Sequence, residues 1–194
     1  MSIMAQYKYL VIHCTATPEK RYVDGDDIKR WHMGPLDNPD GSVTYLGHKF
    51  PNRDALENST IAGKLARKLH GRGWSRPGYS ILVHLDGTKE QLMPWDDDNT
   101  IESNELTNGV LGFNSVARSI CYVGGMDAIT KKSKDTRTAE QNTALLDIVN
   151  DAIKHNPDVQ IGGHNQFNQT SCPGFDVKQW LRDNGINEHN IYKP

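Results

Sequence analysis

The segment from Gly162 to Gly174 places His164 and Cys172 in a loop-forming stretch, with seven residues between them, just ahead of a predicted helix. Two such ligands need a third to hold a metal ion. The third candidate is His13, near the other end of the chain, where an apolar run ends. Two imidazoles and one thiolate suit zinc and leave the fourth tetrahedral position for water or substrate. The sequence therefore predicts one zinc ion, held by residues from both ends of the chain, in a site of the catalytic kind.

A closed structural zinc site would normally need four protein ligands, and the sequence offers no CxxC or HxxxH pair to complete one. An alternative function, a structural zinc domain that mediates protein contacts, would therefore lack its fourth protein ligand. The remaining cysteines, Cys14 and Cys121, are expected to be small buried apolar residues. The remaining histidines are expected at the surface or in local hydrogen bonds. They are His32, His48, His70, His84, His155 and His189.

Alternating side chains predict the strands of a sheet. Residues 7–14 have a period of two, which predicts a strand with His13 at its carboxyl end. Further along, Asp86-Gly87 supplies the turn of a hairpin whose alternation puts Tyr79 and His84 on opposite faces. We therefore expect these two side chains not to meet in one site. The other predicted strands are residues 119–125, which end in a glycine turn, and residues 159–161.

Helical patterns complete the predicted fold. The clearest helix spans residues 138–155, begins with a Thr138-Ala139-Glu140-Gln141 capping box and carries one apolar stripe. Shorter helices are predicted at residues 26–33 and 177–185. Strands and helices that interleave in this way predict a single α/β domain of residues 1–194, in which helices flank a mixed β-sheet.

Length, net charge and apolar content limit the kinds of molecule that this protein is expected to bind. A chain of 194 residues is long enough for one domain with a real core. The formal net charge of −2 calls for neither nucleic acid nor an anionic membrane as a partner. No stretch approaches the roughly 18 apolar residues of a membrane span. Residues 1–6 lack the basic and apolar regions of a secretion signal, so we expect the protein to stay in the cytoplasm of the producing cell. We also expect a monomer.

Four segments occur in the order seen in zinc-dependent N-acetylmuramoyl-L-alanine amidases. They are YLVIHCTAT, GWSRPGYSILVHLDGT, GFNSVARSICYVGG and GHNQFNQTSCPGFDVKQWL, and together they cover roughly half of the chain. The chain is similar above all to the amidase-type lysozymes of phages and to the peptidoglycan recognition proteins. The resemblance implies the α/β fold of that family, one zinc ion on His13, His164 and Cys172, and peptidoglycan as the substrate.

The resemblance also implies roles for two hydroxyl groups. Zinc would polarise a substrate amide and lower the pKa of bound water towards about 7, while a nearby hydroxyl can stabilise the developing oxyanion. Tyr79 matches the tyrosine with this role in the phage lysozymes; its alternative is an aromatic ring buried in the sheet. Thr170 replaces their lysine, as in the amidase-active recognition proteins, and can donate a hydrogen bond but no positive charge. A catalytic glutamate used by the cytosolic anhydromuropeptide amidases is absent, because its strand carries Cys121.

Two stretches depart from the related amidases. In those enzymes a helix like that of residues 26–33 leads almost directly to the Gly-Trp segment, whereas here residues 34–72 intervene. We interpret these residues as a hairpin-like insertion, with a short helix within residues 61–70, and predict that they form part of the rim of the substrate groove. The second departure is Ala117-Arg118-Ser119 in place of the usual Ser-Ile-Gly.

The predicted function is zinc-dependent hydrolysis of the amide bond between N-acetylmuramic acid and the first L-alanine of the peptide stem. The N-terminal residues favour a phage or prophage endolysin that reaches the cell wall after release, with a bacterial cell-wall recycling enzyme as the nearer alternative. A non-catalytic peptidoglycan-binding module is the alternative from another class, because recognition proteins without the cysteine ligand bind the cell wall but do not cut it. Cys172 favours the enzyme.

Overall fold

The computed structural model of the protein describes residues 5–61 and 69–194. Contacts between Cα atoms divide the chain into two compact units. Residues 1–23 and 79–194 form the first, which we call the sheet unit, and residues 24–78 form the second, which we call the hairpin unit. The hairpin unit therefore extends on both sides of the predicted insertion at residues 34–72. That the whole chain forms one domain with an insertion remains a prediction.

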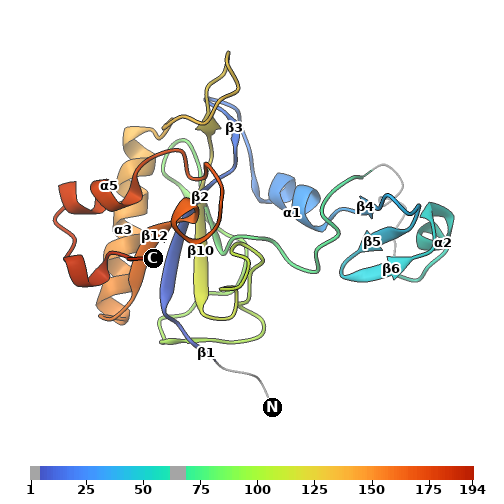
Figure 1. The fold of residues 1–194 in the computed structure, drawn as a ribbon, viewed down its shortest axis with the longest axis horizontal. Helices are drawn as coiled ribbons and strands as arrows, with labels where there is room; N and C mark the ends of the chain where they lie inside the picture. Colours follow the sequence, from blue (N-terminus) through green and yellow to red (C-terminus); the bar gives the residue numbers. More distant parts are fainter. Residues whose placement is uncertain (1–4, 62–68) are drawn as a thin grey trace. The chain divides into compact units, whose positions relative to one another are not determined.

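A five-stranded sheet forms the centre of the sheet unit (Figure 1). Its strands are β2 (Tyr9–Cys14), β7 (Ile81–Val83), β8 (Lys89–Gln91), β10 (Ala117–Tyr122) and β12 (Gln160–Gly163). They lie in the order β12-β2-β10-β7-β8. The first four in this order run parallel, and β8 pairs with β7 in the antiparallel direction through the predicted turn at Asp86-Gly87. The predicted mixed sheet is confirmed.

Two pairs of very short strands extend the sheet unit. They are β1 (Ala5–Gln6) with β9 (Thr100–Ile101), and β3 (Thr17–Pro18) with β11 (Gly125–Met126). The second pair requires a glycine at position 125, where φ is 95° and a Cβ would lie 2.3 Å from Cys14 Sγ. β3 follows β2 and β11 follows β10. The pair therefore continues these two segments of the chain past the carboxyl ends of the central strands.

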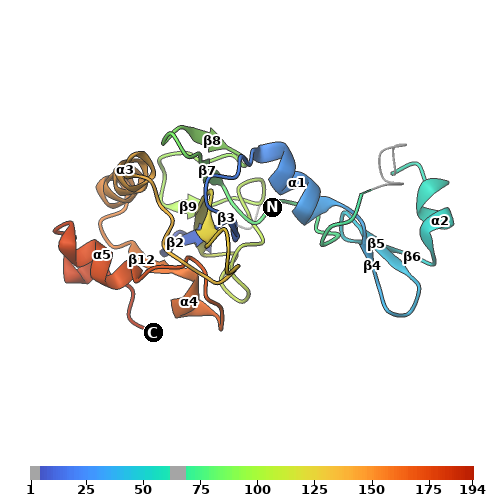
Figure 2. The same cartoon turned by 90° about the horizontal axis from the view of Figure 1, so that it is seen from above.

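Helices α3 (Ala139–His155) and α5 (Val177–Asp183) cover one face of the central sheet (Figure 2). The predicted capping box opens α3: Thr138 Oγ1 accepts from the Gln141 N–H, and Gln141 Oε1 accepts from the Thr138 N–H. The Gln141 amide also donates to the carbonyl oxygens of Val83 and Val123, at the carboxyl edge of the sheet. These bonds fix the start of α3 against β7 and β10.

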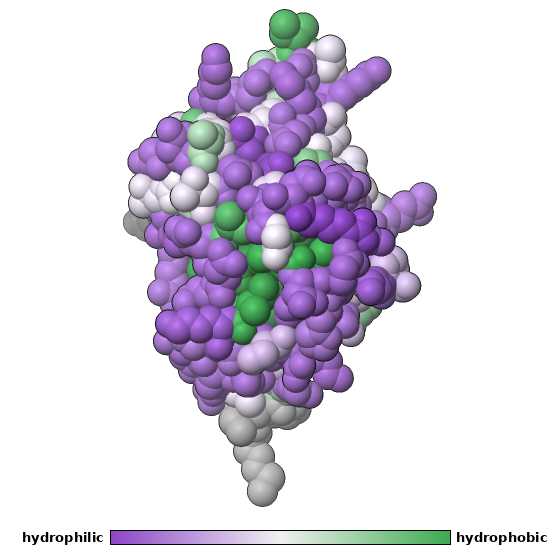
Figure 3. Space-filling view, turned by 90° about the vertical axis from the view of Figure 1, so that its left-hand side faces the viewer, coloured by the Kyte–Doolittle hydropathy of each residue, from purple (hydrophilic) through white to green (hydrophobic). Residues whose placement is uncertain are grey.

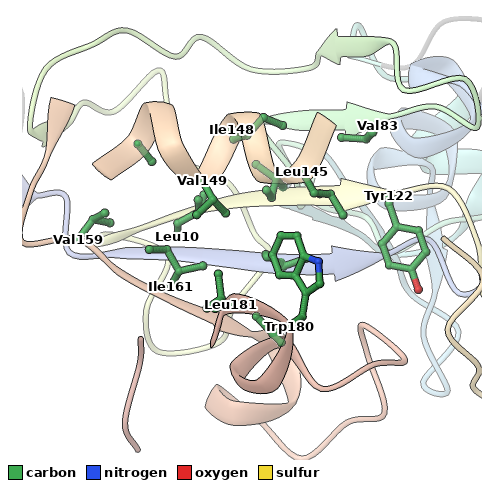
Figure 4. Close-up of a cluster of buried hydrophobic side chains, with 14 of the residues drawn as sticks. Leu10, Val83, Tyr122, Leu145, Ile148, Val149, Val159, Ile161, Trp180 and Leu181 are labelled. Carbon is green, nitrogen blue, oxygen red and sulfur yellow. The ribbon is translucent and has the colours of Figure 1, made fainter. Parts of the chain in front are cut away.

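The main hydrophobic core lies between these two helices and the sheet (Figure 4). Residues that meet there include Leu10, Leu145, Val149, Ile161 and Leu181. Successive residues of a strand point to opposite faces, so Leu10 and Ile12 of β2 enter this core while Val11 and His13 face the other side. The direction of His13 is thus set by the packing of its neighbours in the strand.

A second hydrophobic cluster covers the opposite face of the sheet. Val11, Val110 and Ala117 form it, and Tyr9, Phe113 and Phe167 pack against it. Phe167 belongs to α4 (His164–Phe167), the short helix that follows β12, and η2 (Glu188–Asn190) is a 3-10 turn near the end of the chain. Both faces of β2 are therefore covered, which is typical of a strand in a parallel arrangement.

The outer surface over α3 and α5 is mostly hydrophilic, with one hydrophobic patch near the centre of the face shown in Figure 3. This agrees with the mean hydropathy of −0.66 for the chain. Among the helices of the described residues, none combines the length and the apolar character that crossing a membrane requires.

Arg118 explains the unusual start of β10. Its side chain is 2% exposed and lies against the rings of Tyr7 and Trp95, at 4.8 and 5.0 Å from their centroids. Its Nη2 pairs with Glu105 Oε1 at 3.0 Å, and its Nη1 donates to the carbonyl oxygen of Asp96. A buried charge needs such a partner. Arg118 therefore ties residues 95–105 to a strand that is otherwise regular.

In its described residues, 24–61 and 69–78, the hairpin unit contains two helices and one small antiparallel sheet. They are α1 (Gly25–Met33), α2 (Arg53–Glu57), β4 (Leu36–Asp37), β5 (Val43–Tyr45) and β6 (His48–Phe50). The predicted helix α1 begins where Asp24 accepts from the Asp27 N–H. β5 and β6 pair as the predicted hairpin, with Leu46 and Gly47 at positive φ in the turn. Of the helix predicted within residues 61–70, residues 62–68 lie outside the described residues.

Candidate metal site

His13 lies near the carboxyl end of β2, in register with Cys121 of the neighbouring strand β10. Its side chain is 1% exposed. The carboxyl ends of parallel strands are a common place for functional side chains, because loops that leave them converge at one edge of the sheet. β12 is the neighbour of β2 on its other side, and its carboxyl end leads directly into the segment that carries His164 and Cys172.

Glycines bring that segment close to β2. Gly163 ends β12, and a Cβ there would lie 2.9 Å from Val177 Cγ2 and 3.0 Å from Pro173 Cδ. His164 follows as the first residue of α4. The chain then returns so that the Asn165 N–H donates to the Cys172 carbonyl at 2.8 Å. The absence of a side chain at Gly163 thus lets the returning loop pack against the end of β12.

The structure brings the three predicted ligands together. Their ligand atoms all lie within 4.8 Å of one another. Cys172 Sγ is 3.8 Å from His13 Nδ1, and the ring centroids of His13 and His164 are 4.5 Å apart. A tetrahedral zinc ion, with bonds of about 2.0 Å to nitrogen and 2.3 Å to sulfur, holds such atoms about 3.6 Å apart. The donor set and its spacing therefore fit zinc.

Asn168 supports His164 in this arrangement. Its Oδ1 lies 3.3 Å from His164 Nε2, while its own amide donates to the Phe167 and Leu111 carbonyls. A carbonyl acceptor on one ring nitrogen fixes the orientation of a histidine that binds a metal through the other. Asn168 is not among the residues predicted from the sequence. Its spacing of four residues from His164, within one helical turn, is the signal that points to it.

The sulfur of Cys172 is surrounded by the end of β2. The Cys14 N–H donates to Cys172 Sγ at 3.2 Å. The hydrogen bond with the Cys14 side chain, and after it burial, raises the pKa of the Cys172 thiol well above its ordinary value. A bound metal ion has the opposite effect, because it favours the thiolate. Cys14 and Cys121 are 5% and 0% exposed, which confirms that they are buried.

Tyr79 lies beside the ligand set. Its ring centroid is 5.1 Å from that of His13, with 47° between the rings, and its side chain forms a hydrogen bond with that of Cys121. Tyr79 is partly exposed and precedes β7, so the predicted strand alternation does not extend to it. It is therefore placed toward the ligands rather than buried within the sheet. His84 instead pairs with Glu90 at 3.0 Å.

Thr170 lies on the exposed loop that leads to Cys172. Its Oγ1 accepts a hydrogen bond from the Cys172 N–H at 3.2 Å. Because a hydroxyl carries a donor as well as acceptor lone pairs, this bond leaves its O–H able to donate. Thr170 thus shapes the turn that presents Cys172 and retains the donor that the prediction requires.

The other histidines form separate local contacts. His189 pairs with Asp158, His70 with Asp37, and the Gly78 N–H donates to the buried His32. At the surface, Asp97 and Asp151 lie 3.7 and 3.8 Å from His155 Nδ1, and the three side chains together have the spacing of metal ligands. Exposed acidic groups often gather in this way without a metal. These contacts agree with the predicted surface or locally bonded roles.

Comparison with known proteins gives one family. The pattern described as N-acetylmuramoyl-L-alanine amidase matches residues 4–175. The endolysin of Enterobacteria phage K11 is 29% identical over 171 residues, which are 88% of this chain and 83% of that protein. The endolysin of Klebsiella phage KP32 is 27% identical over 91% of this chain and 87% of its own.

Solved structures show the same fold. The peptidoglycan recognition protein LE, determined in complex with tracheal cytotoxin, superposes with a TM-score of 0.57 at 18% identity and covers 99% of this chain and 86% of its own. At these identities the likeness concerns the fold alone. It confirms the predicted peptidoglycan-recognition-protein-like arrangement of a mixed sheet and helices.

Proposed function

Because the chain belongs to the N-acetylmuramoyl-L-alanine amidase family, we propose that it is a zinc-dependent amidase that cleaves the bond between N-acetylmuramic acid and L-alanine in peptidoglycan. The observation that carries this proposal is the gathering of the His13, His164 and Cys172 ligand atoms within 4.8 Å. A three-ligand set leaves a coordination position for a reacting group, whereas a structural site fills all four. The set therefore favours catalysis over a purely structural role.

Each residue of the site has a distinct task in this proposal. His13, His164 and Cys172 hold the metal, and Asn168 orients His164 through the contact at 3.3 Å. Zinc bound there would polarise the substrate carbonyl and lower the pKa of a bound water. The Tyr79 hydroxyl, next to His13, donates a hydrogen bond to the oxygen of the carbonyl as it gains negative charge. Thr170 supplies a weaker, more exposed donor.

The relatives support a proposal for the biological setting. Both phage proteins named above are endolysins, at 29% and 27% identity over most of each chain. We propose that this protein is likewise an endolysin, which stays in the cytoplasm of the producing cell and acts on the cell wall after release. Its partner is then the muramoyl peptide of peptidoglycan, bound by a monomer.

Metal analysis combined with a digestion assay tests this function. Purified protein is expected to contain about one zinc ion per chain and to release L-alanine amino groups from peptidoglycan. Cys172→Ser, which replaces a soft sulfur ligand by oxygen, is expected to lose zinc and cleavage while it retains some cell-wall binding.

The alternative, a binding module without catalysis, predicts a different result. Such a protein would bind peptidoglycan equally well with and without zinc and would free no amino groups. Peptidoglycan binding without cleavage by zinc-loaded protein would therefore replace the amidase proposal. Absence of zinc after purification, together with no gain of activity when zinc is added to chelated protein, would remove the metal assignment.

A further inference from the structure

Tyr122 reaches from the central sheet to the loop that carries Cys172. It is the last residue of β10 and is 0% exposed. Its hydroxyl donates a hydrogen bond to the carbonyl oxygen of Pro173 at 2.6 Å. In Figure 4 its ring lies at the carboxyl end of the strands, beyond the aliphatic core residues. A buried side chain of the rigid sheet is thus bonded to the backbone of the residue that follows Cys172.

The hydrogen bonds within the loop join residues that are close in sequence. The Gly174 N–H donates to the Ser171 carbonyl at 2.9 Å, and the Cys172 N–H donates to Thr170. Ser133 Oγ, from another exposed segment, donates to Ser171. These bonds shape the turn but do not connect it to the buried sheet. The Tyr122 hydroxyl makes that connection from one side, and the Cys14 N–H makes it from the other through Cys172 Sγ.

We propose that Tyr122 is a positioning residue for the metal site, whose hydroxyl holds the loop at Pro173 so that Cys172 Sγ stays within reach of His13 and His164. The inference rests on the proposed zinc site. It goes beyond that site because Tyr122 is not itself one of the three ligands. When the loop leaves this position, the thiolate moves away from the two imidazoles. The apparent affinity for zinc then falls in proportion to the fraction of molecules in which the loop is held.

The hydroxyl rather than the ring carries this role. The ring belongs to the main hydrophobic core and contacts Phe175, with the centroids 6.1 Å apart. A phenylalanine keeps that packing and removes the O–H, leaving the buried Pro173 carbonyl without its donor. Loss of such a donor is a substantial perturbation in a buried place, whereas the change in shape is small.

Zinc affinity measured against a chromophoric chelator tests the proposal. Tyr122→Phe is expected to weaken zinc binding about tenfold, within the range that supporting groups around metal ligands give. Tyr7→Phe is the matched control. Tyr7 is 2% exposed, and its hydroxyl has no hydrogen-bond partner in the described part of the chain, so its removal is expected to leave zinc affinity unchanged.

Loss of stability alone is excluded by a second control. Ile148→Val removes one methylene from the core face of α3, away from the loop, and lowers the melting temperature without touching the site. If Tyr122→Phe lowers the melting temperature as Ile148→Val does and leaves zinc affinity at the wild-type value, the hydroxyl is merely structural and the proposal is wrong.

Hydrogen exchange tests, independently of zinc, whether the Tyr122 hydroxyl holds the loop. In chelated protein the amide of Gly174, which is bonded to Ser171, is expected to exchange about tenfold faster in Tyr122→Phe than in wild type. Unchanged exchange overturns the inference. A wild-type protein that binds no zinc and cleaves nothing would sink the proposed function, but the exchange rate of Gly174 would still show whether Tyr122 holds the loop.

Discussion

Tyr79 is the residue on which the proposed chemistry depends most after the ligands. Its ring lies against His13 and its hydroxyl bonds with Cys121, so the phenol is held beside the three proposed ligands without belonging to the ligand set. Tyr79→Phe removes one donor and keeps the ring. The expected loss in turnover is about 100-fold, or roughly 2.7 kcal/mol of transition-state stabilisation, with zinc content and KM little changed.

Steady-state kinetics on muramoyl peptides measures this loss, with zinc content determined on the same samples. Tyr22→Phe makes the same chemical change at a side chain that is 71% exposed, and is expected to keep wild-type turnover. Thr170→Val is expected to cost less than Tyr79→Phe, because water can replace an exposed hydroxyl. Wild-type turnover in Tyr79→Phe would mean that the phenol only packs against His13.

The candidate metal ligands could be predicted from the sequence because their side chains have distinctive chemistry. The residues that contact these ligands or their loop could not. His13, His164 and Cys172 were identified because two imidazoles and a thiol at strand and loop ends form a recognised donor set. The contact of Asn168 with His164 and the hydrogen bond of Tyr122 to Pro173, at 3.3 and 2.6 Å, join residues that no sequence pattern pairs. Amides and phenols are common in any sequence, and only the folded chain shows which acceptor lies opposite each of them.

At the scale of elements, local signals determined what could be predicted. The capping box at Thr138 and the Asp86-Gly87 turn predicted the start of α3 and the β7–β8 hairpin, because these bonds join near neighbours in sequence. Strands of two residues, such as β3, have no period to detect. In the sequence, Arg118 only departs from the pattern of the related amidases. Its partner Glu105 is 13 residues away and pairs with it only in the folded chain.

The hairpin unit carries a titratable group that links its stability to pH. Within this unit His32 is buried and accepts a hydrogen bond from the Gly78 N–H, and burial together with the charge of Arg72 lowers its pKa to about 4. An unfolded histidine has a pKa of about 6.5. Stability from neutral His32 is therefore fully present above pH 6.5 and is lost as the pH falls towards 4.

Between pH 7.5 and pH 5 this linkage is expected to lower the free energy of unfolding of the hairpin unit by about 2 kcal/mol. Hydrogen exchange of the Gly78 amide, corrected for the intrinsic pH dependence of exchange, measures it. His32→Asn keeps an acceptor for the Gly78 N–H but has no proton to bind in this range, so its stability is expected to vary less. Equal pH dependence in the two proteins would show that His32 titrates normally.

At the scale of the whole molecule, the candidate metal site joins distant parts of the chain. His13 comes from β2, near the start, whereas His164 and Cys172 follow β12, after the long helix α3. The sheet order β12-β2 makes these segments neighbours. Periodicity predicted each strand, and the ligand set implied that they meet. The division into a sheet unit and a hairpin unit was not predicted, because contacts between distant residues decide it.

In the proposed zinc site, bound zinc is expected to stabilise the folded chain. The unfolded chain does not keep the three ligands together, so zinc binds the folded form preferentially, and at about 100 times its Kd it adds roughly 2.7 kcal/mol. For a chain of this length the melting temperature is expected to rise by about 5–10 °C between chelated and zinc-loaded protein. Differential scanning calorimetry of both samples measures this shift.

Two controls test whether the rise in melting temperature depends on zinc and on the Cys172 sulfur. Magnesium prefers oxygen ligands and is expected to leave the melting temperature of chelated protein unchanged at the same concentration. Cys172→Ser is expected to lose most of the zinc-dependent rise, because oxygen replaces the sulfur on which the affinity depends. Equal melting temperatures for chelated and zinc-loaded wild type would mean that the three side chains, although close together, do not bind zinc in the folded protein.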